Sequence, residues 1–151
     1  MSGKAIRETL GFLGVMASLI FVGLEIRQNT LASRAAAIQE SISVARQQVQ
    51  MYALDAEANR IEMVGRENLS QLSPEEASRF RWMMVSFFWG MQGLHRQWDL
   101  GVLPDEEWQA WTTVICGNLA NPGTRTMWDG FNMFTPGFRA FVESCDSSQG
   151  G

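Results

Sequence analysis

The longest apolar run in the chain lies near its N-terminus, where LGFLGVMASLIFVGL extends from Leu10 to Leu24 without a charged residue. As an α-helix these fifteen residues rise roughly 22 Å, whereas a hydrocarbon core is about 30 Å thick. Thr9 and Ile26 extend the run, and the side chains of Arg7 and Glu25 can reach outward to the interface. The pattern predicts a helical membrane anchor.

Two other interpretations of this run stay open. A buried helix of a soluble domain would also use small residues such as Gly11 and Ala17, which permit close packing. A cleaved signal peptide would need small residues at a cleavage site soon after the run. The residues that follow are instead Glu25-Ile26-Arg27-Gln28, and the first small cluster, at 35–37, lies further along the chain.

The anchor carries two features that suggest contacts. Gly14 and Ser18 are four residues apart, a spacing that lets membrane helices approach closely. Glu25 follows the run directly, and an ionisable group at membrane depth points to a functional contact. The alternative for Glu25 is an interfacial residue that bonds to headgroups or to polar neighbours.

The charges that flank the run nearly balance. Lys4, Arg7 and the α-amine precede it, and Arg27 and Arg34 follow it. Because Lys and Arg stay on the cytoplasmic side, an excess of one charge slightly favours a cytoplasmic N-terminus. The orientation stays open at this stage.

Beyond the anchor, apolar or small residues recur at alternating steps of four and three. They are Leu31, Ala35, Ile38, Ile42, Ala45, Val49, Tyr52 and Ala56. This spacing is a heptad seam. No Pro or Gly occurs between Leu24 and Val64, so we expect one long helix to about Arg66, with residues 28–30 as the alternative place for a break.

The start of the next helix is indicated by Ser73-Pro74-Glu75-Glu76, which forms a capping box with Pro at the first helical position. Its apolar stripe is Ala77, Phe80, Met84, Phe87, Met91, Leu94 and Trp98, and a second stripe is Trp82, Val85 and Trp89. Two apolar faces predict a central helix of a bundle. We expect it to fold back antiparallel on residues 40–66, so that the C-terminal helices or a partner must cover the seam from Leu31 to Ile38.

Shorter helices are expected after Leu103-Pro104-Asp105, through Trp128 and Phe131, and after Thr135-Pro136. No segment alternates as a strand does, so the predicted fold class is all-α. It comprises an N-terminal transmembrane helix continuing into a long helix, packed with an antiparallel helical hairpin and shorter C-terminal helices. The predicted parts are an anchor at 1–30, a helical bundle domain at 31–146 and a disordered tail at 147–151.

Two stretches are similar to known proteins. LIFVGLEIRQNT, from Leu19 to Thr30, is followed by Arg34-Ala35-Ala36-Ala37-Ile38-Gln39, and Pro122-Gly123-Thr124-Arg125 and Trp128 come later. The chain thereby resembles a group of uncharacterised bacterial proteins with one N-terminal membrane helix and a Trp-rich helical domain. The resemblance implies the anchor, a bacterial source and the cytoplasmic membrane, and it implies no chemistry.

The sequence offers little support for catalysis. His95 is the only histidine, which argues against zinc and di-iron sites, and no phosphate-binding glycine motif is present. A net charge of −4 gives no general reason to bind nucleic acid. We therefore expect no enzyme activity, no cofactor and no metal. The two cysteines, Cys116 and Cys145, are expected as buried free thiols, with one disulfide as the alternative.

The expected function is a membrane-anchored interaction module, as an accessory or scaffold subunit of a membrane complex. Its contact residues would be Gly14, Ser18, Glu25, Leu31, Ala35 and Ile38, binding a partner protein or a second copy through the anchor and the stalk from Leu24 to Ala45. The alternative is a lipid or small-molecule sensor with a pocket among Trp89, Trp108, Trp111 and Trp128. Arg125, Asp129 and Arg139 are expected to form structural ion pairs, with anion or headgroup binding as the alternative.

Overall fold

The computed structural model describes residues 3–145, with side chains from residue 10 onward. The predicted tail at 147–151 lies outside these residues. Within them all regular structure is helical, which confirms the all-α class. The chain divides into two units, residues 1–36 and 37–151, which join within helix α1 (Gly3–Leu54). The compact unit thus begins at Ala37, whereas the sequence predicted that the helical domain begins at residue 31.

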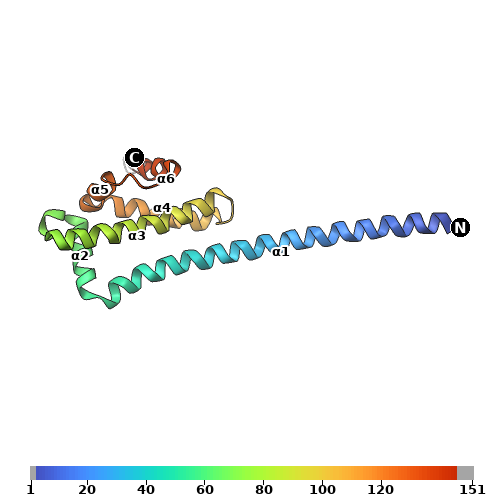
Figure 1. The fold of residues 1–151 in the computed structure, drawn as a ribbon, viewed down its shortest axis with the longest axis horizontal. Coiled ribbons are helices and arrows are strands. Elements are labelled where there is room, and N and C mark those ends of the chain that lie inside the picture. The colour runs from blue at the N-terminus through green and yellow to red at the C-terminus, as the bar shows by residue number, and fades with distance from the viewer. Residues whose placement is uncertain (1–2, 146–151) are drawn as a thin grey trace. The chain divides into compact units, whose positions relative to one another are not determined.

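The first unit is the N-terminal part of α1, drawn in blue in Figure 1. Every large apolar side chain from Leu10 to Leu31 is exposed. Two of its polar side chains bond back to their own helix: the Ser18 hydroxyl donates to the Gly14 carbonyl and the Thr30 hydroxyl to the Ile26 carbonyl, each at 2.9 Å. The helix continues through residues 28–30 without the break that was considered there.

The expectation of one helix reaching Arg66 is wrong, because α1 ends at Leu54 and α2 (Ala56–Glu67) begins two residues later. Asp55 lies between them in an extended conformation. Its carboxylate accepts hydrogen bonds from the backbone N–H groups of Glu57 and Ala58, each at 3.0 Å. A short acidic side chain at this position stabilises a new helix start at the expense of helix continuation.

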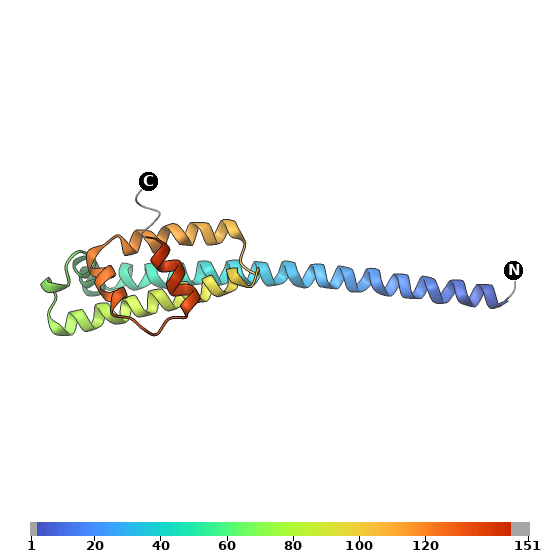
Figure 2. The same ribbon diagram turned by 90° about the horizontal axis from the view of Figure 1, so that it is seen from above.

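Helix α3 (Pro74–Asp99) follows a short 3₁₀ turn, η1 (Leu69–Gln71). The predicted capping box is present, with Ser73 and Glu76 bonded reciprocally. Residues 37–54 of α1 run antiparallel to α3, as both ribbon views show (Figures 1 and 2). This confirms the hairpin, and the α3 stripe Phe80, Met84, Phe87 and Met91 is buried as expected.

The face of α1 that packs in this hairpin differs from the predicted seam. Ala37 and Ser41 are buried and Val44 is half-buried, whereas Ile42 and Val49 remain 45% and 64% exposed. The packed face is thus shifted by one residue, or about 100° around the helix. The Val44 side chain reaches α3 at Gly90, where an added Cβ would lie 3.1 Å from a Val44 methyl group. Of the larger side chains of the predicted seam, Tyr52 packs against the core, whereas Ile42 and Val49 do not.

The remaining helices, α4 (Asp105–Leu119), α5 (Pro122–Asp129) and α6 (Pro136–Ser144), complete the core. Aromatic rings dominate it. Trp128 packs against Phe88 and Phe134 with ring centroids 4.6 Å and 5.1 Å away, and its indole is almost fully buried. Such ring pairs add about 0.5–1.5 kcal/mol each beyond the area they bury.

A disulfide joins Cys116 of α4 to Cys145 at the end of α6, with an S–S distance of 2.04 Å. This corrects the expectation of two free thiols. The two residues are 29 positions apart in the chain, and folding α6 over the end of α4 brings their Cα atoms to 5.2 Å. The bond therefore holds the last helix on the bundle.

One carboxylate lies in the core region. Glu62 of α2 is buried and forms an ion pair with Arg66 at 3.1 Å. Burial raises the pKa of the Glu62 carboxyl, and Arg66 opposes that shift. Arg125 pairs with Asp129 at 3.3 Å, and Arg139 pairs with Glu143, so the structural ion pairs expected of Arg125 and Arg139 are present.

Candidate functional site

The predicted contact residues within the anchor share one face of α1, because Gly14, Ser18 and Glu25 are spaced by four and seven residues. A Cβ added at Gly14 would meet nothing within 4 Å. The Ser18 hydroxyl is satisfied by the Gly14 carbonyl. This face is therefore small, open and free of unpaired hydroxyl groups, as a close helix contact in lipid requires.

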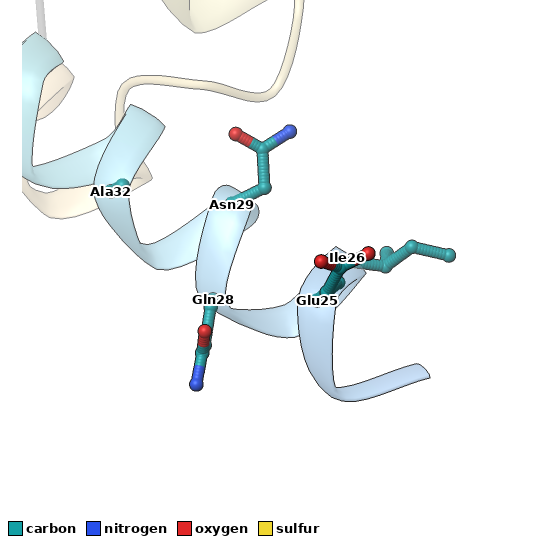
Figure 3. Close-up of a pocket in the computed structure, with 5 residues that line it drawn as sticks. All are labelled: Glu25, Ile26, Gln28, Asn29 and Ala32. Carbon is teal, nitrogen blue, oxygen red and sulfur yellow. The ribbon is translucent and has the colours of Figure 1, made fainter. Parts of the chain in front are cut away.

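Glu25 lines a shallow recess together with Ile26, Gln28, Asn29 and Ala32 (Figure 3). All five residues come from two turns of one helix, and Gln28 and Asn29 point to opposite sides in the picture. Among the described residues nothing forms an ion pair or hydrogen bond with the Glu25 carboxylate. The recess is a gap between side chains of one helix, so it offers a ligand no second wall.

The three predicted contact residues further along α1 lie on a second face. Leu31 and Ala35 are exposed, and Ile38 is half-buried. Their steps of four and three keep them on one side of the helix. The structure therefore leaves Leu31 and Ala35 available for a contact, and Ile38 only in part.

A larger groove, with a volume of about 610 Å³, lies in the helical unit between the second half of α3 and the start of α6. It is lined by Trp89, Gln92, Gly93, His95, Arg96, Asp99, Thr135 and Gly137. Small-molecule sites commonly have volumes of about 300–1,000 Å³. This groove is the candidate functional site of the described residues.

One wall of the groove is the indole of Trp89, which is 52% exposed. At its base, the imidazole of His95 is held among four aromatic rings. Trp98, Trp108, Phe138 and Phe141 have centroids 5.3–5.7 Å from it. Burial among these rings lowers the pKa of His95, which favours the neutral form of the imidazole.

The polar groups of the groove are arranged by a few contacts. The backbone N–H of Thr135 donates to the Gln92 side-chain carbonyl at 2.7 Å, which ties the start of α6 to α3. Arg96 donates to Asp99 at 3.0 Å, and both side chains are largely exposed at the rim. The groove thus presents a cation and an anion that balance each other.

The sensor pocket suggested among four tryptophans is not formed. Trp108 and Trp128 are buried in the core and Trp111 is half-buried, so only Trp89 faces the groove. The sequence did not indicate the four aromatic rings that surround His95. The sequence did contain a signal for one side of the groove, because residues 89, 92, 93, 96 and 99 fall on one face of a helix. The contribution of Thr135 and Gly137 depends on the fold.

Within the described residues, no group of three or more His, Cys, Asp or Glu side chains is arranged to hold a metal ion. Comparisons with family models, with curated proteins and with solved structures each found no match.

Proposed function

We propose that this chain is a single-pass membrane protein whose helical domain works by associating with another protein and not by catalysis. The observation that carries the proposal is the exposed apolar helix at the start of the chain. Between Leu10 and Leu54, α1 contains an 18-residue window with a mean hydropathy of 1.8, and none of it is buried. Apolar surface of this extent in water is strongly unfavourable, so lipid is its natural surrounding.

The exposure of this helix also weighs against the other interpretations. The core helix of a soluble protein would be mostly covered by its own chain, whereas no part of this window is. A signal peptide would be followed closely by small residues, but Glu25, Ile26 and Arg27 follow the apolar run. A membrane anchor remains the interpretation that agrees with both observations.

The disulfide supports placing the helical domain on the oxidising side of the membrane. Disulfides persist in extracellular and periplasmic proteins and are rare in the bacterial cytosol. The Cys116–Cys145 bond therefore favours one orientation across the membrane, which the nearly balanced flanking charges do not decide. In a bacterial cytoplasmic membrane, which the sequence resemblance implies, this side is the periplasm or the cell exterior.

The association part of the proposal rests on apolar residues that the chain itself leaves bare. Leu31 is 58% exposed and Ala35 is exposed, one turn apart on the same face of α1. Within the helical unit, Ile42 and Val49 are exposed seven residues apart. Exposed apolar side chains that recur on one face of a helix are a feature of contact surfaces. The partner is another protein or a second copy of this chain.

Anchoring and orientation can be tested together. We expect the full chain to stay with the membrane after carbonate extraction, and its recovery in the soluble fraction would refute the anchor. For orientation, Ser70→Cys is placed in a background in which both native cysteines are serine, because Ser70 is exposed in η1. A membrane-impermeant maleimide should label it in intact spheroplasts. Labelling only after lysis would put the domain on the cytosolic side.

Association is tested by adding charge to one face of α1. Leu31→Lys should release the partner in a mild-detergent pull-down. In a separate variant, a photo-crosslinking residue at position 31 should capture the partner. Ser33→Lys is the matched control, because residue 33 is also exposed but lies about 200° around the helix from residue 31. If crosslinking captures only the chain's own helices and the purified protein is monomeric, the association proposal is wrong.

A second candidate function, a small-molecule sensor, is favoured by the groove beside Trp89. The groove is separate from the apolar face at Leu31, so the two functions can be tested independently.

A further inference from the structure

We propose that the groove beside Trp89 binds a saccharide. The inference gives the sensor function a ligand class, and it does not depend on the anchor, because every lining residue belongs to the helical unit. It is argued from the charge, the ring surface and the hydrogen-bonding groups of the groove.

The charge balance of the groove favours an uncharged ligand. Arg96 and Asp99 lie 3.0 Å apart and neutralise each other, and burial favours the neutral form of the His95 imidazole. A free anion would have to compete with Asp99 for Arg96, and a free cation would have to compete with Arg96 for Asp99. Neither sign of charge therefore has an unopposed partner here.

The exposed ring of Trp89 favours a ligand with a flat apolar face. The face of an indole is electron-rich and attracts the weakly positive C–H groups of a ring laid on it. Gly93 lies one turn further along α3 and a Cβ there would meet nothing within 4 Å, so the space beside the indole stays open. A sugar ring presents such C–H groups on one face.

The remaining groups of the groove are suited to hydroxyl groups, which donate and accept at once. The Asp99 carboxylate only accepts, the Arg96 guanidinium only donates, and a neutral imidazole does one of each. Within the described residues, neither nitrogen of His95 has a hydrogen-bond partner, and the Thr135 side chain makes no capping bond to α6. These groups are free to bind adjacent hydroxyl groups.

The groove is less suited to a lipid acyl chain. Of its lining side chains only Trp89 is a large apolar group, and the others carry polar atoms or are glycine. An acyl chain would leave the His95 imidazole and the Thr135 hydroxyl without partners, at a cost for each polar group removed from water. A polyhydroxylated ring avoids that cost.

The test is a titration of the full-length chain, in a detergent without a sugar headgroup, with glucose, N-acetylglucosamine and their β-1,4-linked dimers. The indole N–H signals in the NMR spectrum report on the six tryptophans separately once assigned by Trp→Phe variants. We expect at least one of these sugars to shift the Trp89 signal in a saturable way and to leave the Trp82 signal in place.

Variants make the result specific. Trp89→Ala should weaken binding about fivefold or more, which is the lower end of what stacking on an aromatic side chain contributes for a nucleobase. Asp99→Asn should weaken it less. Trp82→Ala is the matched control, because Trp82 is 62% exposed on the same helix, seven residues earlier, and does not line the groove. Far-UV circular dichroism of each variant checks that the fold is retained.

Three results would overturn the proposal. One is the absence of a Trp89 shift with every sugar of the panel. Another is an equal loss of binding in the Trp82 and Trp89 variants, which would indicate nonspecific stacking. The third is a Trp89 shift with acetate, glycine or a lipid headgroup but with no sugar, which would retain a sensor and reject the ligand class. None of these results would affect the anchor or the association at Leu31.

Discussion

Gly123 of α5 lies so close to Gly65 of α2 that a Cβ added to Gly123 would be 1.8 Å from the Gly65 carbonyl oxygen. Gly65 is confined on its other side, because its own added Cβ would lie 2.7 Å from the ring of Phe80. The two glycines thus allow the backbones of α2 and α5 to touch, and the ring of Phe80 from α3 packs against Gly65. The contact joins α2, α3 and α5 at one point.

Substitution of Gly123 by alanine should therefore destabilise the fold. The methyl group meets backbone atoms, which cannot turn away as a side chain can, so we expect a loss of roughly 1–3 kcal/mol or more. Gly117→Ala is the matched control. Gly117 lies within α4 with open space around its Cβ position, and alanine there should stabilise the helix by about 0.5–1 kcal/mol. Equilibrium denaturation of the solubilised full chain measures both, and equal effects would contradict the close contact.

Removal of the disulfide should lower stability without changing the helical content. For a closed loop of 29 residues, loop-closure entropy suggests a loss of about 3–4 kcal/mol on replacing Cys116 and Cys145 by serine. The wild-type chain under reducing conditions should unfold at the same denaturant concentration as the double variant. If a reductant leaves the wild-type midpoint unchanged, the two thiols are not bonded in the isolated protein.

The capping box of α3 should make stability sensitive to acid. The backbone N–H of Ser73 donates to the Glu76 carboxylate at 2.7 Å and Arg60 also bonds to it, and these contacts lower the pKa of Glu76 from 4.5 to about 2. A carboxyl whose pKa is lower in the folded state stabilises that state fully at pH values above its pKa in the unfolded chain. That contribution should disappear as the pH falls from about 4.5 to about 2.

Glu76→Gln should therefore reduce the dependence of the unfolding midpoint on pH over this interval. Glu75→Gln is the control, because it removes the same charge from the neighbouring residue, which does not join the capping box. Denaturation series at several pH values would provide the comparison. Equal pH profiles for the two variants would count against the assigned role of Glu76.

Truncation of Phe87 should test the helical hairpin. Its side chain is buried on α3, and Phe87→Ala should cost roughly 3–5 kcal/mol. Trp82→Ala removes an even larger ring from the same helix at an exposed position, so we expect a loss below about 1 kcal/mol. A loss below about 1 kcal/mol for Phe87→Ala as well would contradict the observed packing.

Helix positions could be predicted where the signal is local. The Ser73-Pro74-Glu75-Glu76 start of α3 depends on groups within one turn, and the structure has it as expected. The break at Asp55 is equally local, since Asp is a preferred N-cap, but the continuous apolar spacing around it hid the signal. Periodicity marks which residues share a face and does not by itself mark where a helix is interrupted.

The choice among apolar faces required the assembled helices. On α1 the stripe of larger residues with Ile42 and Val49 was predicted to pack, yet the face with Ala37, Ser41 and Val44 is the one that is covered. The Val44 side chain reaches Gly90 of α3, where the absence of a Cβ leaves room for it. The pairing of Cys116 with Cys145 likewise depends on α6 returning to the end of α4. The spacing of residues within one helix does not indicate which of its faces a distant helix will contact, or how close Cys116 and Cys145 will lie.

The amino-acid order alone was sufficient for the all-α class and the apolar N-terminal helix, because these depend on hydropathy and on helical period. The groove beside Trp89 was not accessible in that way. Six of its eight lining residues lie on α3, from Trp89 to Asp99, and in the sequence they look like an ordinary exposed helix face; Thr135 and Gly137 supply the rest of the lining. A concave site needs two walls, and the second wall comes from a segment more than 35 residues away, which only the packing of α6 against α3 brings into place.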